Sequence, residues 1–246
     1  MSTQQTLDKM RWMKICTMAE EYNRQLKTPE IQNLSFDERF SLLVDSEWNS
    51  RQNKRLANLV RKAGMKYNCA MEEFIFTPER SVNRDTILQL SSSSWINAGL
   101  NVLVTGSTGS GKTFLGCALG NAACRNGYKV LFKRVPRLLT DLALSKGDGS
   151  YNRLMRDLKK VRLLILDDWG LNNFEPDEGR DLLEVIEDRT QNSSTVILSQ
   201  LSTKDWHALF RDSIIGDAVM DRLVHGSFIV ELDSKDSMRS YNFKKA

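Results

Sequence analysis

The segment Gly106–Thr113, GSTGSGKT, has residue types and spacing that suit phosphate chemistry, since it matches the pattern G-x-x-x-x-G-K-[ST]. Glycines at 106, 109 and 111 permit backbone angles and a closeness of approach that a Cβ would prevent. Successive N–H groups of such a loop converge on an anion at the positive end of the following helix. The segment is therefore predicted to be a phosphate-binding loop.

Within this loop two side chains are expected to act directly on a nucleotide. Lys112 would place its ammonium on the β- and γ-phosphates of ATP, and the Thr113 hydroxyl would ligate Mg²⁺. A Gly/Ser-rich turn is the alternative, but an apolar strand pattern precedes the loop and a helical pattern follows it. The residues expected to bind the nucleotide are Gly106, Ser107, Thr108, Gly109, Ser110, Gly111, Lys112, Thr113 and Phe114.

A second element with catalytic residue types lies downstream, in the stretch 161–170 with the sequence VRLLILDDWG. Its consecutive apolar residues predict a buried strand that ends in two acids. Asp167 is expected to hold Mg²⁺ alongside Thr113, and Asp168 to orient or deprotonate the attacking water. An acidic turn is the alternative. Because the more usual pair at such a site is Asp-Glu, the shorter Asp168 leaves the turnover rate open.

A third strand pattern, STVILSQL at 194–201, ends in polar residues, so that Ser199 or Gln200 could sense the γ-phosphate. Strands alternate with helices along this part of the chain, which predicts an α/β fold with a parallel sheet flanked by helices. The carboxyl ends of parallel strands share one edge of the sheet. We therefore expect Lys112, Asp167 and Gln200 to meet there.

Separate elements are expected on either side of this core. Residues 1–77 are predicted to be a small all-α domain, with helices near 10–22, from Phe36 to about Val44 or beyond, and from Asn49 to about Gly64. Ser35 and Glu38 match a capping box before the second of these helices. After the phosphate loop we expect strands at 129–135 and 227–232, helices at 152–160, 177–191, 204–210 and 214–223, and a polar loop at 146–151.

The composition excludes several classes of protein. The chain has 246 residues, 27% charged residues and a mean hydropathy of −0.40. It shows neither an apolar run long enough to cross a membrane nor a signal-peptide pattern, so a cytoplasmic protein is expected. Four cysteines without C-x-x-C spacing and two histidines support neither a zinc site nor a disulfide framework. Cys117 and Cys124 are expected to face the core.

The net charge of +4 is unevenly distributed. Six basic residues and no acid lie between Arg51 and Lys66, and eleven basic residues and three acids lie between Arg125 and Arg162. Such clusters suit a polyanionic partner. Solvated helix faces would have a similar composition, so charge alone leaves the partner open.

Several motifs together resemble those of the IstB-like helper ATPases of insertion-sequence transposons, relatives of the DnaC-type helicase loaders among AAA+ ATPases. They are GSTGSGKT, KGDGSY, LLILDDWGL, ILSQLS, DAVMDRLVHGS and DSMRS. The resemblance extends over nearly the whole chain. It implies an AAA+ P-loop NTPase domain at 78–246 that lacks a full helical lid, after the N-terminal domain at 1–77.

The resemblance also implies partners and further site residues. It implies a homo-oligomer in which Arg222 serves as an arginine finger in trans, with Gln200, or else Ser199, as the phosphate sensor. It implies ATP-dependent binding of double-stranded DNA and delivery of that DNA to an IstA-like transposase. The N-terminal helices, with the cations from Arg51 to Lys66, would contact the transposase or a neighbouring subunit. The candidate DNA-binding residues are Lys133, Arg134, Arg137, Lys146 and Arg153.

Three other functions remain open from the sequence. A DnaC-like replicative helicase loader would share the ATPase core and differ in the partner. A small-molecule kinase would use the same loop, but no acceptor-binding group of residues follows it, and Asp167 with Asp168 suits water activation. A nucleotide-gated scaffold with little turnover would bind ATP without needing rapid hydrolysis.

Overall fold

The computed structural model describes residues 2–76 and 82–232. It divides into two compact units, Met1–Asn58 and Leu59–Ala246, and each is described by itself. The expected domain boundary between residues 77 and 78, and the DSMRS motif, fall outside the described residues. Within the described ranges, no helix combines the length and the apolar character that a membrane span needs.

The second unit is built on a five-stranded parallel sheet in the order β2-β3-β4-β1-β5. The strands are β1 (Val102–Gly106), β2 (Val130–Arg134), β3 (Leu163–Trp169), β4 (Ser194–Ser199) and β5 (Phe228–Leu232). This confirms the predicted parallel α/β fold. The sheet places β1 between β4 and β5, so the phosphate loop starts from the interior of the sheet.

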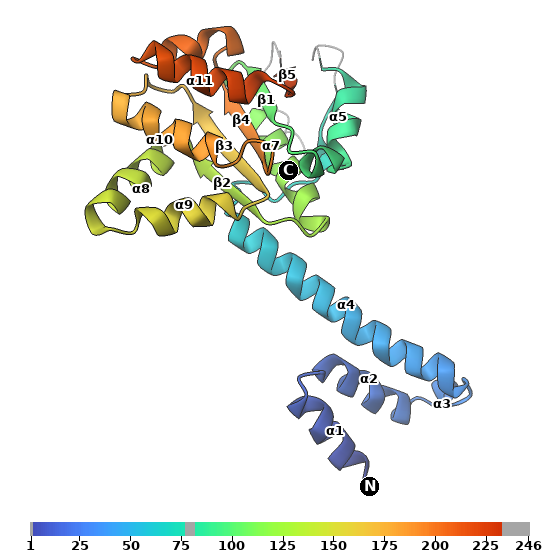
Figure 1. The fold of residues 1–246 in the computed structure, drawn as a ribbon. Coiled ribbons are helices and arrows are strands. Elements are labelled where there is room, and N and C mark those ends of the chain that lie inside the picture. Colours follow the sequence, from blue (N-terminus) through green and yellow to red (C-terminus); the bar gives the residue numbers. More distant parts are fainter. Residues whose placement is uncertain (1, 77–81, 233–246) are drawn as a thin grey trace. The chain divides into compact units, whose positions relative to one another are not determined.

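Helices cover both faces of the sheet (Figure 1), which explains why consecutive strand residues are apolar. Leu164, Leu166 and Ile197 face a core formed with α8 to α11. Ile165 and Leu198 face the opposite way and lie against Gly120 and Gly116 of α7. A strand buried on one face alone would alternate apolar and polar residues, so the continuous apolar runs reflect the two-sided burial.

Local signals account for where several helices of this unit begin. A proline occupies the first turn of both α8 and α10, where its missing N–H costs nothing. The Asn83 and Asp212 side chains cap α5 and α11. The helices are α5 (Arg84–Ser91), α6 (Ser94–Asn97), α7 (Lys112–Arg125), α8 (Val135–Asp148), α9 (Tyr151–Lys159), α10 (Pro176–Glu187) and α11 (Ser213–Val224), with 3₁₀ turns η1 (Met71–Glu73), η2 (Thr203–Asp205) and η3 (His207–Leu209).

Four expectations about elements were wrong. The first helix, expected near 10–22, is divided between α1 (Thr3–Trp12) and α2 (Cys16–Lys27) by a turn in which Lys14 has a positive φ. The two helices expected between Phe36 and Gly64 are one helix, α4 (Phe36–Ala63), because no glycine or proline interrupts it before Gly64 adopts a left-handed conformation. The polar loop expected at 146–151 is only Gly149 and Ser150, since α8 continues to Asp148. The helix expected at 204–210 is the two 3₁₀ turns η2 and η3.

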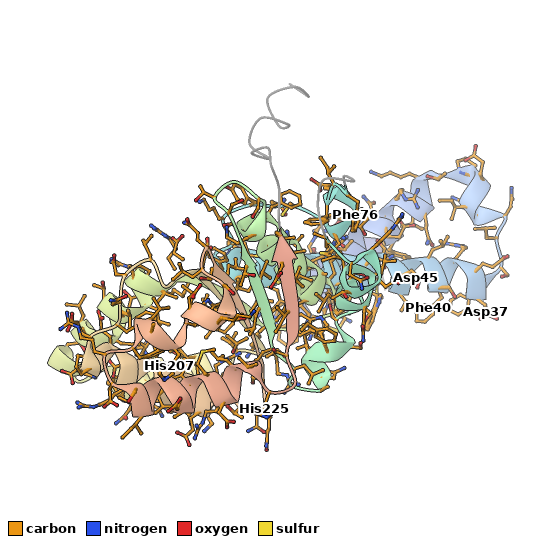
Figure 2. All side chains as sticks on the ribbon, turned by 90° about the horizontal axis from the view of Figure 1, so that it is seen from above. Asp37, Phe40, Asp45, Phe76, His207 and His225 are labelled. Carbon is orange, nitrogen blue, oxygen red and sulfur yellow. The ribbon has the colours of Figure 1, made fainter. Side chains whose placement is uncertain are left out.

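The first unit consists of α1 (Thr3–Trp12), α2 (Cys16–Lys27), α3 (Pro29–Gln32) and the part of α4 that ends at Asn58. Polar contacts hold α2 to α4: the Met18 N–H donates to Glu47 (3.1 Å), and the Gln25 side chain donates to the carbonyl of Arg39 (3.0 Å). Phe40 projects from α4 with Asp37 and Asp45 on the same helix (Figure 2). Its apolar ring is half exposed, so this unit keeps apolar surface in contact with solvent.

Candidate nucleotide-binding site

The phosphate loop connects β1 to α7, the strand–loop–helix arrangement that its function requires. Gly106 and Gly111 have positive φ values of 147° and 94°. A Cβ at Gly106 would collide with the carbonyl oxygen of Leu232. The loop therefore needs glycine both for its angles and for its space, and it leaves the N-terminus of α7 open to an anion.

Lys112 lies inside this loop. Its ammonium donates to the carbonyls of Gly106 and Ser107, each at 2.7 Å, and the residue is almost fully buried. Burial lowers the pKa of the Lys112 ammonium, while the carboxylates of Asp167 and Asp168 act in the opposite direction. The cation is thus held over the loop by carbonyl groups, where the phosphates of a nucleotide would offer it stronger acceptors.

The donor set for a magnesium ion lies at the start of α7 and the end of β3. The Thr113 hydroxyl donates to both carboxylate oxygens of Asp167, at 3.3 and 3.1 Å. Burial, and next the nearby Asp168, raises the pKa of the Asp167 carboxyl, whereas the Thr113 hydrogen bond lowers it. A hydroxyl and a carboxylate at this separation suit Mg²⁺, which keeps several waters and phosphate oxygens as its other ligands.

Among the residues the structure describes, no group of three or more His, Cys, Asp or Glu side chains could enclose a metal ion. This fits the donor set of Thr113 and Asp167, because Mg²⁺ in nucleotide sites is held by one or two carboxylates together with the phosphates. The loop, the buried cation and this oxygen pair therefore fit a magnesium–triphosphate group.

Asp168 turns away from the regular strand. It has a φ of 60°, and the pairing of β3 with β4 shifts register between Leu166 and Trp169. A positive φ is unusual outside glycine, although Asp tolerates it better than most residues. The turn allows the Asp168 carboxylate to pair with Arg134, whose Nε donates at 2.5 Å. The acid expected to activate water is therefore bound to a cation at the end of the neighbouring strand β2.

The two sensor candidates lie in different surroundings. Gln200, just after β4, accepts a hydrogen bond from the Thr108 hydroxyl at 2.7 Å, so it contacts the phosphate loop directly. Ser199 is buried, and its hydroxyl donates to the carbonyl of Trp169 at 2.8 Å. Of the two residues, Gln200 is the one that faces the nucleotide side.

Arg222 lies where the parallel strands begin, at the edge of the sheet formed by their amino ends (the amino edge), opposite the phosphate loop. Its carbonyl accepts from Asn101, which precedes β1 and also accepts from the backbone N–H of Thr195 at the start of β4. Its guanidinium donates to the carbonyl of Ala218 and to Glu187. A strand of five residues rises about 16 Å, so Arg222 is not placed to reach the phosphate loop of its own chain.

Most of the candidate DNA-binding cations pair with acids of the same unit. The pairs are Lys133 and Arg137 with Asp141 (2.8 and 3.2 Å), Arg134 with Asp168 (2.5 Å), and Lys146 with Asp181 (2.5 Å). Arg153 is exposed on α9. The fold brings in Asp168 and Asp181 from later parts of the chain, and this reduces the positive charge that the basic stretch shows in sequence.

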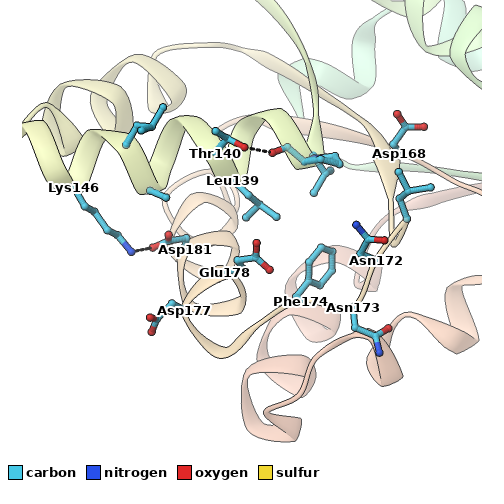
Figure 3. A pocket seen from close by; sticks show the side chains of 15 residues that line it. Leu139, Thr140, Lys146, Asp168, Asn172, Asn173, Phe174, Asp177, Glu178 and Asp181 are labelled. Carbon is cyan, nitrogen blue, oxygen red and sulfur yellow. Dashed lines mark hydrogen bonds and ion pairs between the residues drawn. The ribbon is translucent and has the colours of Figure 1, made fainter.

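A cavity of about 520 Å³ lies beside Asp168, between α8, α10 and the segment that joins β3 to α10 (Figure 3). Its apolar lining includes Leu139 and Phe174. Its acidic lining consists of Asp168, Asp177, Glu178 and Asp181, the last of which is bound by Lys146. Carboxylates repel phosphates, so this cavity does not suit the triphosphate, which we place on the phosphate loop.

The contact between Arg134 and Asp168 is not predicted from the sequence, in which Arg134 is a candidate DNA ligand only. The structure pairs Arg134 in register with Asp167, at the carboxyl ends of β2 and β3. The order of strands in the sheet decides this neighbourhood. A cation at the end of a strand that precedes the acidic strand is the one signal in the sequence that could have indicated it.

Comparisons with known proteins show the family of this chain. The family model for the IstB-like ATP binding protein matches residues 8–246. An insertion-sequence ATP-binding protein of Sinorhizobium fredii, y4pL, is 39% identical over 97% of this chain and 98% of its own length. The ATP-binding protein of insertion sequence IS1162 from Pseudomonas fluorescens is 45% identical over 82% of this chain and 87% of its own length.

Solved structures show the same fold at low sequence identity. The DnaC helicase loader has a TM-score of 0.57 and 18% identity, covering 68% of this chain and 97% of its own. The replication initiator DnaA bound to AMPPCP and single-stranded DNA has a TM-score of 0.59 and 19% identity, covering 74% of this chain and 56% of its own. These similarities confirm the AAA+ P-loop fold. With a family model that spans nearly every residue and a phosphate loop in working geometry, the chain belongs to the IstB-like ATP-binding proteins.

Proposed function

We propose that this protein is an Mg²⁺-dependent ATPase that assembles on double-stranded DNA and delivers that DNA to a partner transposase. The observation that carries the ATPase part is the contact of Thr113 with Asp167 beside the buried Lys112. The relatives that are ATP-binding proteins of insertion sequences support the transposase as partner. The protein is an IstB-type member of the AAA+ ATPases, and its DNA and partner are our proposal.

Each residue of the site has a part in the proposed hydrolysis. Lys112 exchanges its two loop carbonyls for phosphate oxygens, while the backbone N–H groups at the start of α7 hold the phosphates in place. Thr113 and Asp167 hold Mg²⁺, which neutralises charge on the phosphates when it is bound. Asp168 orients the attacking water, and Gln200 detects the γ-phosphate from its place against Thr108.

We propose that Arg222 acts on the nucleotide of a neighbouring copy. Its place at the amino edge of the sheet, far from the loop of its own chain, supports a role in trans. A cation that reaches the γ-phosphate from another subunit stabilises the charge of the transition state. Hydrolysis would then require an oligomer, because no single chain holds both the loop and the arginine at one site.

The pair of Arg134 and Asp168 supports DNA-stimulated hydrolysis. Arg134 is exposed and is one of the cations we assign to DNA, together with Lys133, Arg137, Lys146 and Arg153. When a DNA phosphate takes Arg134, the Asp168 carboxylate loses its partner and becomes available to water. The same guanidinium cannot serve both acceptors fully, so binding of DNA favours the active arrangement.

The N-terminal domain, which we place at residues 1–77, is the part we assign to the transposase or a neighbouring subunit. Its helix α4 leaves Phe36 and Phe40 exposed to solvent, with their rings stacked on each other. Large exposed apolar side chains near one another indicate an interaction surface.

Sedimentation of the full chain with and without MgATP and duplex DNA tests this function. We expect a larger, DNA-bound species only when both are present, and we expect the Lys112→Ala variant to remain small. Asp168→Asn should assemble on DNA without hydrolysing ATP. Assembly that is identical without nucleotide, or a wild-type protein that binds no DNA, would contradict the proposal.

The helicase-loader alternative shares this ATPase core and is favoured only by the DnaC-like fold. A pull-down with the full chain separates the two: retention of a transposase supports our proposal, and retention of a replicative helicase supports the alternative. Full biological function of Asp168→Asn would instead support a scaffold with little turnover.

A further inference from the structure

The first unit carries an unusually exposed tryptophan at the end of α1. The Trp12 side chain is 86% exposed and the adjacent Met13 is 53% exposed. Tryptophan is highly buried on average in folded proteins, so a nearly bare indole on a folded helix is an informative exception. Exposed apolar surface of this kind marks a place where another molecule binds.

Cations from two distant parts of the sequence surround this tryptophan. Lys9, Arg11 and Lys14 flank it along the chain. Arg51 of α4 reaches the same place, since its Nη2 donates to the carbonyl of Lys14 at 3.2 Å. Residues three and four further along a helix share its face, which adds Lys54 and Arg55. We call the set Lys9, Arg11, Trp12, Met13, Lys14, Arg51, Lys54 and Arg55 the Trp12 patch.

Few negative charges offset these cations. Arg11 pairs with Asp8 at 3.4 Å, and Arg51 pairs with Glu47 at 2.8 Å. Glu47 is almost fully buried, and it also accepts a hydrogen bond from the N–H of Met18. Six cations thus lie near two paired acids, and the patch has a positive potential.

Contacts that do not involve Trp12 hold the backbone of the patch in place. Lys14 adopts a φ of 60° in the turn between α1 and α2. Beyond that turn, the Thr17 hydroxyl bonds the Ser50 hydroxyl at 2.9 Å. With the Arg51 contact, these bonds hold the turn against α4. The exposed indole is therefore presented from a fixed position and does not support the fold of the unit.

We propose that the Trp12 patch is a second nucleic-acid contact of this chain, in which the cations hold the sugar–phosphate backbone and the Trp12 ring stacks on a base. Positive surface combined with an aromatic ring is the arrangement by which proteins bind nucleic acid without sequence preference. The inference rests on the proposed DNA binding and adds a site that lies outside the ATPase unit.

A contrasting surface in the same unit argues for nucleic acid over a protein partner. Trp48, also on α4, is 61% exposed, but Asp45 lies three residues before it and Arg51 three residues after it, so an acid balances the cation near this ring. Phosphates are therefore attracted less strongly there than at the Trp12 patch, where cations outnumber acids. The two exposed tryptophans therefore differ in the charge of their surroundings, which makes Trp48 a matched control.

Tryptophan fluorescence gives a direct test with the full chain. Of the five tryptophans, Trp95, Trp169 and Trp206 are buried, so in a Trp48→Phe variant Trp12 is the exposed indole. Titration with a single-stranded oligonucleotide and with a duplex should quench this emission. Stronger quenching by the single strand indicates stacking on an open base, and equal quenching indicates insertion at a distorted duplex step; both support the proposal.

Affinity measurements complete the test. Trp12→Ala should weaken DNA binding about tenfold, whereas Trp48→Ala should leave it unchanged. Lys14→Gln with Lys54→Gln should reduce the slope of log affinity against log salt by about 2. Unchanged MgATP affinity and thermal unfolding serve as controls for folding.

Two results would overturn the inference. One is that wild type binds DNA and Trp12→Ala binds it equally well, with no quenching of Trp12. The other is that Trp12→Ala breaks an oligomer that forms without DNA, which would make the patch a protein interface. A wild-type protein that binds no DNA at all is a different failure, since it removes the proposed function as well.

Discussion

The two edges of the central sheet hold different halves of the proposed catalytic apparatus. At the carboxyl edge, Lys112, Thr113, Asp167 and Gln200 contact one another or the phosphate loop. At the amino edge, Arg222 contacts Asn101 and Glu187, which lie away from the phosphate loop. One edge is assembled within the chain, and in our proposal the other supplies a cation to the nucleotide of a second chain.

This difference follows from the geometry of parallel strands. All carboxyl ends meet at one edge, so loops from β1, β3 and β4 bring their side chains together without further arrangement. The helix α11 returns to the amino edge before β5 starts, and it carries Arg222 with it. The fold therefore separates the loop from the arginine within a subunit.

Removal of the Lys112 ammonium at the carboxyl edge should have the largest effect on nucleotide binding and hydrolysis. Lys112→Ala removes the cation from the loop, and we expect nucleotide binding to fall below detection and hydrolysis with it. Titration calorimetry with MgATP measures the first and phosphate release the second. Retained affinity in this variant would show that the loop does not hold the phosphates.

Removal of the Arg222 guanidinium at the amino edge should leave the binding of MgATP intact. For Arg222→Gln we expect hydrolysis to fall by about 10³-fold with little change in the Kd for MgATP. Mixing this variant with Lys112→Ala should restore part of the activity, because one subunit then supplies the loop and the other the arginine. Absence of any restoration in a mixture that forms oligomers would place Arg222 outside the neighbour's site.

Removal of the contact between Arg134 and Asp168 should change the rate of ATP hydrolysis less than the two substitutions above. An exposed ion pair is worth up to about 1 kcal/mol, so Arg134→Gln should raise hydrolysis without DNA by roughly two- to fivefold. Stimulation by DNA should decrease in the same variant. Arg137→Gln is the matched control, since Arg137 pairs with Asp141, and its hydrolysis without DNA should not change.

The smallest expected effect is on stability, through the hydrogen bonds that Asn101 makes at the amino edge. The Asn101 side chain joins Thr195 and Arg222, and Asn101→Ala should lower the free energy of unfolding by about 1–3 kcal/mol. Urea denaturation measures this change. Asn97→Ala, which removes only an exposed bond to Tyr128, should stay within about 0.5 kcal/mol of wild type.

Much of the fold was predictable because its signals are local. The apolar runs of the strands and the glycines of the loop appear in consecutive residues, and the structure confirms the parallel α/β fold. The burial of Cys117 and Cys124 is likewise confirmed; burial raises the pKa of both thiols, that of Cys124 to about 11. The capping box of Ser35 and Glu38 is confirmed at the start of α4, whereas the break expected between Val44 and Asn49 is absent because no helix-breaking residue enforces it.

The sequence by itself determined the phosphate loop and the family to which the chain belongs, and it predicted an acidic strand end for Mg²⁺ and water. Only the tertiary structure decided which charges meet. Arg134 pairs with Asp168, Lys146 with Asp181, and Arg51 with the turn beside Trp12. The physical reason is that residue types follow from local pattern, whereas the partner of a side chain depends on strand order and helix packing over long stretches of chain.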